Sequence, residues 1–77
     1  MYTNSFIQNF AEQFDETDPG VIKSETVFKD LEEWSSIIAL SVIAMVDEEY
    51  NVTINGEDVL NSNTIEDLFN VVKSRVQ

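Results

Sequence analysis

The sequence predicts an all-α protein, a small antiparallel four-helix bundle with three main helices and one short helix. Apolar residues recur at helical spacing in three segments, which is the pattern of amphipathic or buried helices. The chain has 77 residues and no cysteine, which fits a single domain over residues 1–77 without disulfides. Histidine is absent as well, so the core must come from helix packing rather than from a zinc site.

The first helix is expected to be amphipathic, with Thr3 or Asn4 as its N-cap. Polar residues separate its apolar positions, which follow the helical period: Phe6, Ile7, Phe10, Ala11 and Phe14. The turn residues Asp18-Pro19-Gly20 cannot continue a helix, so the helix must end before them.

Residues 16–34 show no sustained period, and we expect an ordered connection that packs on the helices. Six apolar side chains can hold it there: Val21, Ile22, Val27, Phe28, Leu31 and Trp34. A short 3₁₀-like turn is expected at Phe28–Leu31. Trp34 is interpreted as a packed anchor of this connection, and Glu32 and Glu33 as solvated charges.

The second helix is predicted from about Ser36 to Tyr50, with Ser35 as its N-cap. Its apolar residues cover more than one face, as in the buried centre of a bundle: Ile37, Leu40, Ile43, Ala44, Val46 and Tyr50. Three acids, Asp47 to Glu49, crowd the last turn, where the helix macrodipole disfavours negative charge. They are expected to serve solubility or a partner.

The segment from Val52 to Leu60 has two interpretations. Asn55-Gly56 is a hairpin signal, but a lone two-stranded hairpin is barely stable. We therefore predict a loop followed by one helical turn near Glu57–Leu60. The last helix begins at a capping box from Thr64 to Asp67, and its buried stripe is Ile65, Leu68, Phe69, Val72 and Val76.

The charge balance restricts the partners. Fifteen acidic residues against four basic ones give a net charge of -11, which argues against nucleic acid and anionic membranes and favours basic protein surfaces. The longest apolar run, residues 37–46, is about half of the roughly 20 residues that span a bilayer. No stretch resembles a signal peptide. We therefore expect a cytoplasmic monomer without membrane insertion.

Catalysis by this chain is not expected. General acid–base chemistry most often uses histidine, and there is none. Phosphate-binding loops need clustered glycines, whereas Gly20 and Gly56 are far apart. The sequence therefore predicts a protein that is not an enzyme.

A calcium loop is also not expected. Asp47, Glu49, Asn51, Thr53 and Asp58 fall at ligand positions of an EF-hand loop. The sharp turn of that loop needs glycine where this chain has Val52, and its last ligand is a bidentate glutamate rather than an aspartate. We interpret the pattern as a charged helix end that runs into a loop, with no dedicated metal site.

Two serines stand together at the start of the second helix. A serine at such a place is most often an N-cap, and Ser35 can fill that role. Ser36 is then left without a structural task, and its hydroxyl is a candidate for the function.

Four segments of the chain follow a pattern known from one family. They are Phe28-Lys29-Asp30-Leu31, Ser36-Ile37, Asp47-Glu48-Glu49-Tyr50 and Thr64-Ile65-Glu66-Asp67-Leu68. In these segments the chain from Phe28 onward resembles the acyl carrier protein family, including the peptidyl and D-alanyl carriers. The resemblance implies an acyl-carrier-like fold and a covalent 4′-phosphopantetheine group, derived from coenzyme A, on Ser36. This group would hold an acyl or aminoacyl cargo as a thioester.

The resemblance also implies partners, namely a phosphopantetheinyl transferase and the enzymes that load and transfer the cargo. Their contacts are expected at Ser35, Ile37, Ile38, Ser41, Asp47 and Glu48. The family usually has an aspartate at the position of Ser35, and often acids early in the second helix. If Ile38 is exposed, docking there is more apolar than electrostatic. We infer a carrier dedicated to one pathway, in lipid or secondary-metabolite biosynthesis.

The interior between the second, third and fourth helices is a possible shelter for an acyl chain, with the adaptable Met45 nearby. Two other interpretations stay open. One is an unmodified, carrier-like acidic module that docks a basic partner protein. The other is a small antitoxin-like or regulatory protein with one tight partner. Attachment at Ser35 is an alternative to Ser36, and the sequence does not identify the cargo.

Overall fold

The computed structural model describes residues 3–76 of the chain. Four α-helices carry the fold: α1 (Thr3–Ala11), α2 (Ser36–Tyr50), α3 (Gly56–Leu60) and α4 (Ile65–Arg75). Two 3₁₀ turns, η1 (Pro19–Val21) and η2 (Phe28–Asp30), lie in the connection between α1 and α2. Within residues 3–76 the only β-type pairing is an isolated bridge between Val27 and Thr64. The small helical bundle expected from the sequence is confirmed.

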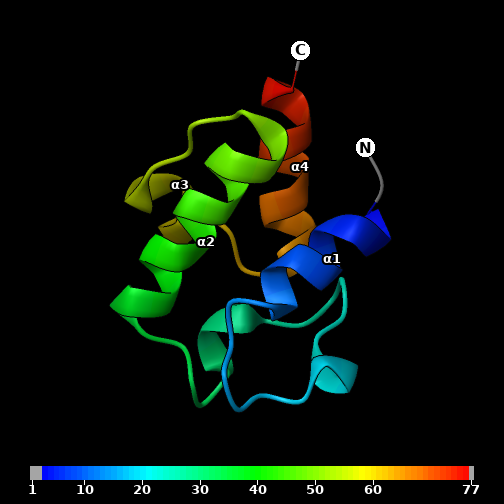
Figure 1. Ribbon diagram of the computed structural model, residues 1–77. Helices are drawn as coiled ribbons and strands as arrows, with labels where there is room; N and C mark the ends of the chain where they lie inside the picture. Colours follow the sequence, from blue (N-terminus) through cyan, green and yellow to red (C-terminus); the bar gives the residue numbers. More distant parts are fainter. Residues whose placement is uncertain (1–2, 77) are drawn as a thin grey trace.

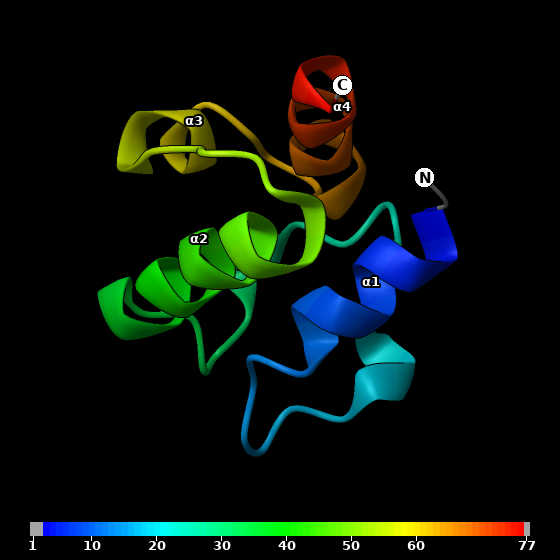
Figure 2. The same ribbon diagram turned by 45° about the horizontal axis from the view of Figure 1, so that its top comes forward.

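The helices pack in a ring of neighbours. α1 lies against α2 and α4, and α3 lies against α2 and α4 from the other side (Figure 1). α1 and α2 run in opposite directions across the picture in Figure 2, whereas α4 stands upright there and is therefore steeply inclined to both. The antiparallel relation thus holds for the first pair of helices.

The first helix is shorter than predicted. It ends at Ala11, and the next residues form a turn in which the Phe14 N–H donates to the Ala11 carbonyl at 3.1 Å. Phe14 still enters the core from this turn, together with Phe6 and Phe10. The apolar spacing therefore identified the buried side chains correctly but not the helix end, because one tight turn keeps nearly the same spacing.

The connection between α1 and α2 is ordered and packed, as predicted. Ile22 and Phe28 are buried. Two of its carbonyl groups accept hydrogen bonds from the first turn of α4: Thr26 from the Ile65 N–H at 3.2 Å, and Ser24 from the Glu66 N–H at 2.9 Å. The connection closes the bundle below α1 in Figure 1.

Trp34 anchors the end of this connection. Its ring lies 4.9 Å from that of Phe28, edge to face, and 6.4 Å from that of Phe10, stacked. Such aromatic pairs add about 0.5–1.5 kcal/mol beyond the area that they bury. The interpretation of Trp34 as a packed anchor is confirmed, and it fixes the chain two residues before α2.

The prediction that α2 is the buried centre of the bundle is wrong. One face is buried through Ile38, Val42, Met45 and Val46, but Ile37 is 74% exposed and Leu40 is 66% exposed. A chain of this size buries only about 60% of its surface and cannot surround a 15-residue helix. The short α3 covers only part of the remaining face.

Capping boxes start both α3 and α4. Thr64 and Asp67 form the box of α4, as predicted, and Asn55 and Asp58 form a box at α3 that was not predicted. The loop followed by a helical turn is confirmed for residues 52–60, and the hairpin is not formed. Val76, predicted to belong to the buried stripe, lies beyond the end of α4 and is exposed.

Two basic side chains hold the short α3. Arg75 of α4 binds the Asp58 carboxylate through two hydrogen bonds of 2.7 and 2.9 Å. Lys29 of η2 donates to the Leu60 carbonyl at the other end of the helix. The bond from Arg75 is the largest cause that lowers the pKa of Asp58, followed by the Asn55 amide. A helix of five residues would not be stable alone, so these contacts and the buried Val59 hold it.

Candidate functional site

Ser36 is the first residue of α2, and its side chain is exposed. The preceding Ser35 has extended backbone angles (φ -154°, ψ 173°) and accepts the Ile38 N–H on its Oγ at 3.3 Å. This confirms Ser35 as the N-cap. Within residues 3–76, the Ser36 Oγ makes no hydrogen bond. Its hydroxyl is therefore free for a reaction that adds a group to it.

The start of α2 is electrostatically suited to an anion. The amides of Ile38 and Ala39 donate to Ser35, but those of Ser36 and Ile37 find no acceptor in the described part of the chain. The first turn carries no acidic residue. Unpaired amides at a helix start favour a phosphate there by about 0.3–1 kcal/mol. A phosphodiester on the Ser36 Oγ fits this environment.

A groove of about 430 Å³ opens beside Ser36, between α2 and α3. Apolar side chains dominate its walls, and Lys29 lies at its edge; it is lined by Lys29, Trp34, Ser35, Ser36, Ala39, Leu40, Ile43, Gly56, Val59 and Leu60. This opening is a surface groove between α2 and α3, and it differs from the interior between α2, α3 and α4 that was expected as a shelter for an acyl chain. Met45 is not part of it, because its buried side chain borders α1 instead.

The residues predicted for partner contacts separate into two groups. Ile37, Asp47 and Glu48 are exposed, as is the cap Ser35, and Ser41 is half-buried on the side of α2 that faces α1. Ile38 is only 8% exposed, so its assignment to a docking surface was wrong. It lies about 100° around the helix from Ile37 and thus falls on the core side.

Leu40 is a surface residue that the predictions did not assign to docking. It lies one turn after Ser36 on the same side of α2, where helical spacing brings residues four apart together. With Ile37 and Leu60, which is 72% exposed, it forms an apolar surface around the serine. The helical period alone could have placed Leu40 beside Ser36, but only the structure shows that this side is uncovered.

Glu33 was interpreted as a solvated charge, and the structure adds contacts that this interpretation did not include. Its carboxylate accepts hydrogen bonds from the backbone amides of Asp15, Glu16 and Thr17 and from the Thr17 hydroxyl. The Thr17 hydroxyl, followed by the Asp15 amide, lowers the pKa of Glu33 below its ordinary value. The donors lie 16 to 18 residues upstream, so no local pattern in the sequence indicates this arrangement.

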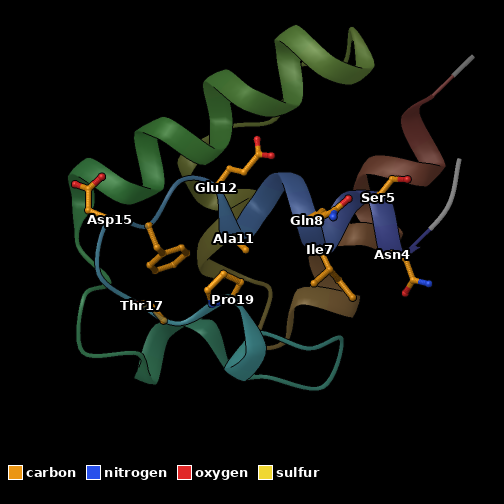
Figure 3. Close-up of a pocket in the computed structure, with 10 residues that line it drawn as sticks. Asn4, Ser5, Ile7, Gln8, Ala11, Glu12, Asp15, Thr17 and Pro19 are labelled. Atoms are coloured by element: carbon orange, nitrogen blue, oxygen red, sulfur yellow. The ribbon is translucent and has the colours of Figure 1, made fainter.

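A second groove, of about 630 Å³, lies on the outer side of α1. Figure 3 shows side chains of α1, including Ile7 and Ala11, together with Pro19 of the following connection. Its charged residues are Glu12 and Asp15, and no basic residue lines it. It offers neither an activated nucleophile nor a cation for an anionic ligand, so it is a weaker candidate than the start of α2.

Two further structural findings concern metals and membranes. In the described range no three His, Cys, Asp or Glu side chains lie together in a way that could hold a metal ion. None of the helices there has the length and apolar character needed to traverse a bilayer.

Comparison with known proteins gives one family. The family model described as "Phosphopantetheine attachment site" matches residues 5–72, which is most of the chain. No curated protein and no solved structure gives a significant match. The match includes α2 and α3 in full, most of α1 and α4, and the two serines at the start of α2. The chain therefore belongs to the phosphopantetheine attachment site family, the carrier proteins defined by covalently bound 4′-phosphopantetheine.

Proposed function

We propose that this chain is a carrier protein in which the Ser36 Oγ bears the 4′-phosphopantetheine group and an acyl or aminoacyl cargo. One observation supports Ser36 above all others: its exposed hydroxyl makes no hydrogen bond within residues 3–76, while Ser35 alone provides the cap. The bound group supplies a thiol that can form a thioester, which a chain without cysteine cannot supply itself.

Attachment requires a partner enzyme. The Ser36 Oγ forms a bond to the phosphorus that carries the pantetheine arm of coenzyme A, and the adenosine bisphosphate portion leaves. No described side chain hydrogen-bonds to the Oγ as a base, so the transferase must accept its proton. The open amides of Ser36 and Ile37 then stabilise the negative charge of the phosphodiester.

The exposed face of α2 is the proposed docking surface. Its first three turns carry Ser36, Ile37 and Leu40 and no charged residue, and its end carries Asp47 and Glu48. These two ends are about 16 Å apart along the helix. We therefore expect partner enzymes with an apolar recess near Ser36 and basic residues about 16 Å away.

Ser35 in place of aspartate supports a dedicated transferase and pathway. An aspartate there would add a negative charge for the basic surface of a general transferase, and this chain lacks it. Ser36 with an uncharged first turn favours recognition by shape and apolar contact. The groove between α2 and α3 gives an apolar cargo a place to lie, although it does not select one cargo.

The test is the intact mass of the protein after incubation with coenzyme A and phosphopantetheinyl transferases, including the transferase of the native host. The expected result is a gain of one phosphopantetheine that is absent in Ser36→Ala and retained in Ser35→Ala. A gain in Ser36→Ala would move the attachment to Ser35.

The net charge of -11 supports a second candidate, an unmodified acidic module that docks a basic partner protein. It predicts no mass gain with any transferase. It also predicts binding of a basic protein that weakens steeply with salt.

A further inference from the structure

We propose that Glu33 is a positioning residue for Ser36: it binds the segment 15–17 to the start of α2 and thereby holds the attachment site in one conformation. This role rests on the proposed function, because it concerns the presentation of the same hydroxyl. Glu33 does not touch the reacting atoms and is three residues away from Ser36 in the chain.

The carboxylate of Glu33 accepts four hydrogen bonds from residues 15–17. Its Oε2 accepts the Asp15 N–H at 2.7 Å, and its Oε1 accepts the Glu16 N–H at 3.0 Å and the Thr17 N–H at 2.9 Å. The Thr17 hydroxyl donates to Oε1 at 2.7 Å. Successive amides around one anion form a binding nest, and hydrogen bonds to a charged acceptor are about twice as strong as neutral ones.

This contact is the tie between two distant segments. Within residues 3–76, the other hydrogen bonds of residues 31–35 are local: Leu31 and Trp34 donate within the connection, and Ser35 accepts from α2. None of the basic side chains in the described range binds Glu33. In the part of the chain that the structure describes, this carboxylate is therefore the only polar attachment between the segment before α2 and the turn after α1.

Three successive residues then lead to the site, and each is held by a different interaction. Glu33 is held by the amides of residues 15–17, Trp34 by aromatic packing on Phe10 and Phe28, and Ser35 by its cap on α2. Ser36 follows directly. Without the contact of Glu33, the segment before Ser36 loses its attachment on the side away from α2. On the side of α2, the Ser35 cap is a single hydrogen bond of 3.3 Å.

A looser start of α2 has a specific kinetic consequence. If only a fraction of the molecules presents the start of α2 in the conformation that binds the transferase, the apparent affinity falls by that fraction. Once bound, the Ser36 Oγ and its surroundings are unchanged. The KM for the carrier should therefore rise while kcat is retained.

The experiment compares Glu33→Gln with Glu32→Gln. Glutamine keeps the shape of Glu33 but turns an amide N–H₂ toward one of the donors, while Glu32 is an exposed neighbour whose replacement removes the same charge. Phosphopantetheine transfer is followed by mass spectrometry under steady-state conditions. We expect Glu33→Gln to raise KM about fivefold with kcat within about twofold, and Glu32→Gln to match the original protein.

The second variant is Thr17→Val, which removes one of the four donors and decides the matter if Glu33→Gln does not fold. It should raise KM in the same direction by a smaller factor. In ¹H–¹⁵N spectra, both substitutions should shift the amides of residues 15–17 and also that of Ser36.

Three results would overturn the positioning role: an unchanged KM in a folded Glu33→Gln or Thr17→Val, an equal change in Glu32→Gln, or amide shifts confined to residues 15–17. Failure of the proposed function is a separate outcome, seen when the original protein gains no mass. The chemical shift of the Ser36 amide is then the remaining test of the positioning role. If the substitutions leave that shift unchanged, the positioning role is rejected.

Discussion

The starts of α2 and α4 use the same capping principle to different extents. At α4, the Thr64 Oγ1 accepts the Asp67 N–H at 3.1 Å, and the Asp67 carboxylate accepts the amides of Asn63 and Thr64, both at 3.1 Å. Two acids stand in its first turn. At α2, one serine oxygen forms the only side-chain cap among residues 3–76, and the first turn carries no acid.

This difference in capping indicates which helix start has backbone amides available for a ligand. The first amides of α4 are occupied, since those of Ile65 and Glu66 donate to carbonyls of the connection. The amides of Ser36 and Ile37 stay open beside an exposed hydroxyl, within the part of the chain that the structure describes. At the start of α4 the protein itself supplies acceptors for the first amides. At the start of α2 the open amides are suited to an added phosphate.

The strongest test of this contrast is Ser36→Ala. It should abolish phosphopantetheine attachment completely while changing the free energy of unfolding by less than about 0.5 kcal/mol, because the side chain has no structural partner. Intact mass and urea unfolding measure the two effects. A large loss of stability would mean that the Ser36 side chain stabilises the fold, which would contradict the difference between the two helix starts.

Thr64→Ala should show the reverse behaviour. Loss of this N-cap should lower the free energy of unfolding by about 1 kcal/mol, which corresponds to about 4–8 °C in Tm for a domain of this size. Attachment at Ser36 should proceed with unchanged kcat and KM. Ser35→Ala, which removes a longer bond, should cost about 0.5 kcal/mol. Equal costs at the two caps would contradict the view that α4 is the more completely capped helix.

Ser35→Asp should sharpen the comparison by giving α2 the acid that it lacks. Stability should change little, since Ser and Asp are about equal as N-caps. A general phosphopantetheinyl transferase should modify the variant about severalfold faster, because the new carboxylate can meet its basic surface. The measurement is the initial rate of mass gain, with Glu32→Asp as a variant that leaves the charge unchanged. Equal rates for the two variants would remove the electrostatic explanation.

The smallest expected effect is in the pH dependence. The Thr64 amide, followed by the Asn63 amide, lowers the pKa of Asp67 below its ordinary value. A carboxyl with a lowered folded pKa stabilises the protein above its unfolded pKa, and this contribution is lost as the pH falls through the folded value. The amide protons of Asn63 and Thr64 should therefore titrate with Asp67 in NMR spectra below the ordinary pKa of aspartate.

The amides of Ser36 and Ile37 should not follow the Asp67 titration, since no carboxylate lies in their turn. The pKa of Glu33 is also lowered, chiefly by the Thr17 hydroxyl, so its contact should weaken in the same direction. The carboxylates of Asp15, Glu16 and Glu32 are its neighbours in the two joined segments. A shift of the Ser36 amide that tracks the amides of residues 15–17 would support the positioning role of Glu33.

Much of the architecture was predictable because its signals are local. The caps Ser35 and Thr64 and the helices that follow them were placed correctly, since capping and the helical period act within one or two turns. Phe14 was counted in the helical pattern of α1 but lies after its end, because a tight turn and a helix share the spacing of Phe10 and Phe14.

The errors at the site share a non-local cause. The periodicity of α2 places apolar residues on every side, so it cannot distinguish the buried Ile38 from the exposed Ile37. That distinction depends on how much surface α1, α3 and α4 can cover. The role of Glu33 depends on the amide of Asp15, 18 residues earlier in the chain.

The amino-acid order by itself determined the helices, their caps, the acidic character and the pair of serines, because propensity, periodicity and charge act along the chain. Only the tertiary structure decided which face of α2 meets solvent, which groove opens beside Ser36, and which carboxylate holds the segment before it. These features arise when elements far apart in the chain pack together, since burial and long-range hydrogen bonds depend on three-dimensional neighbours.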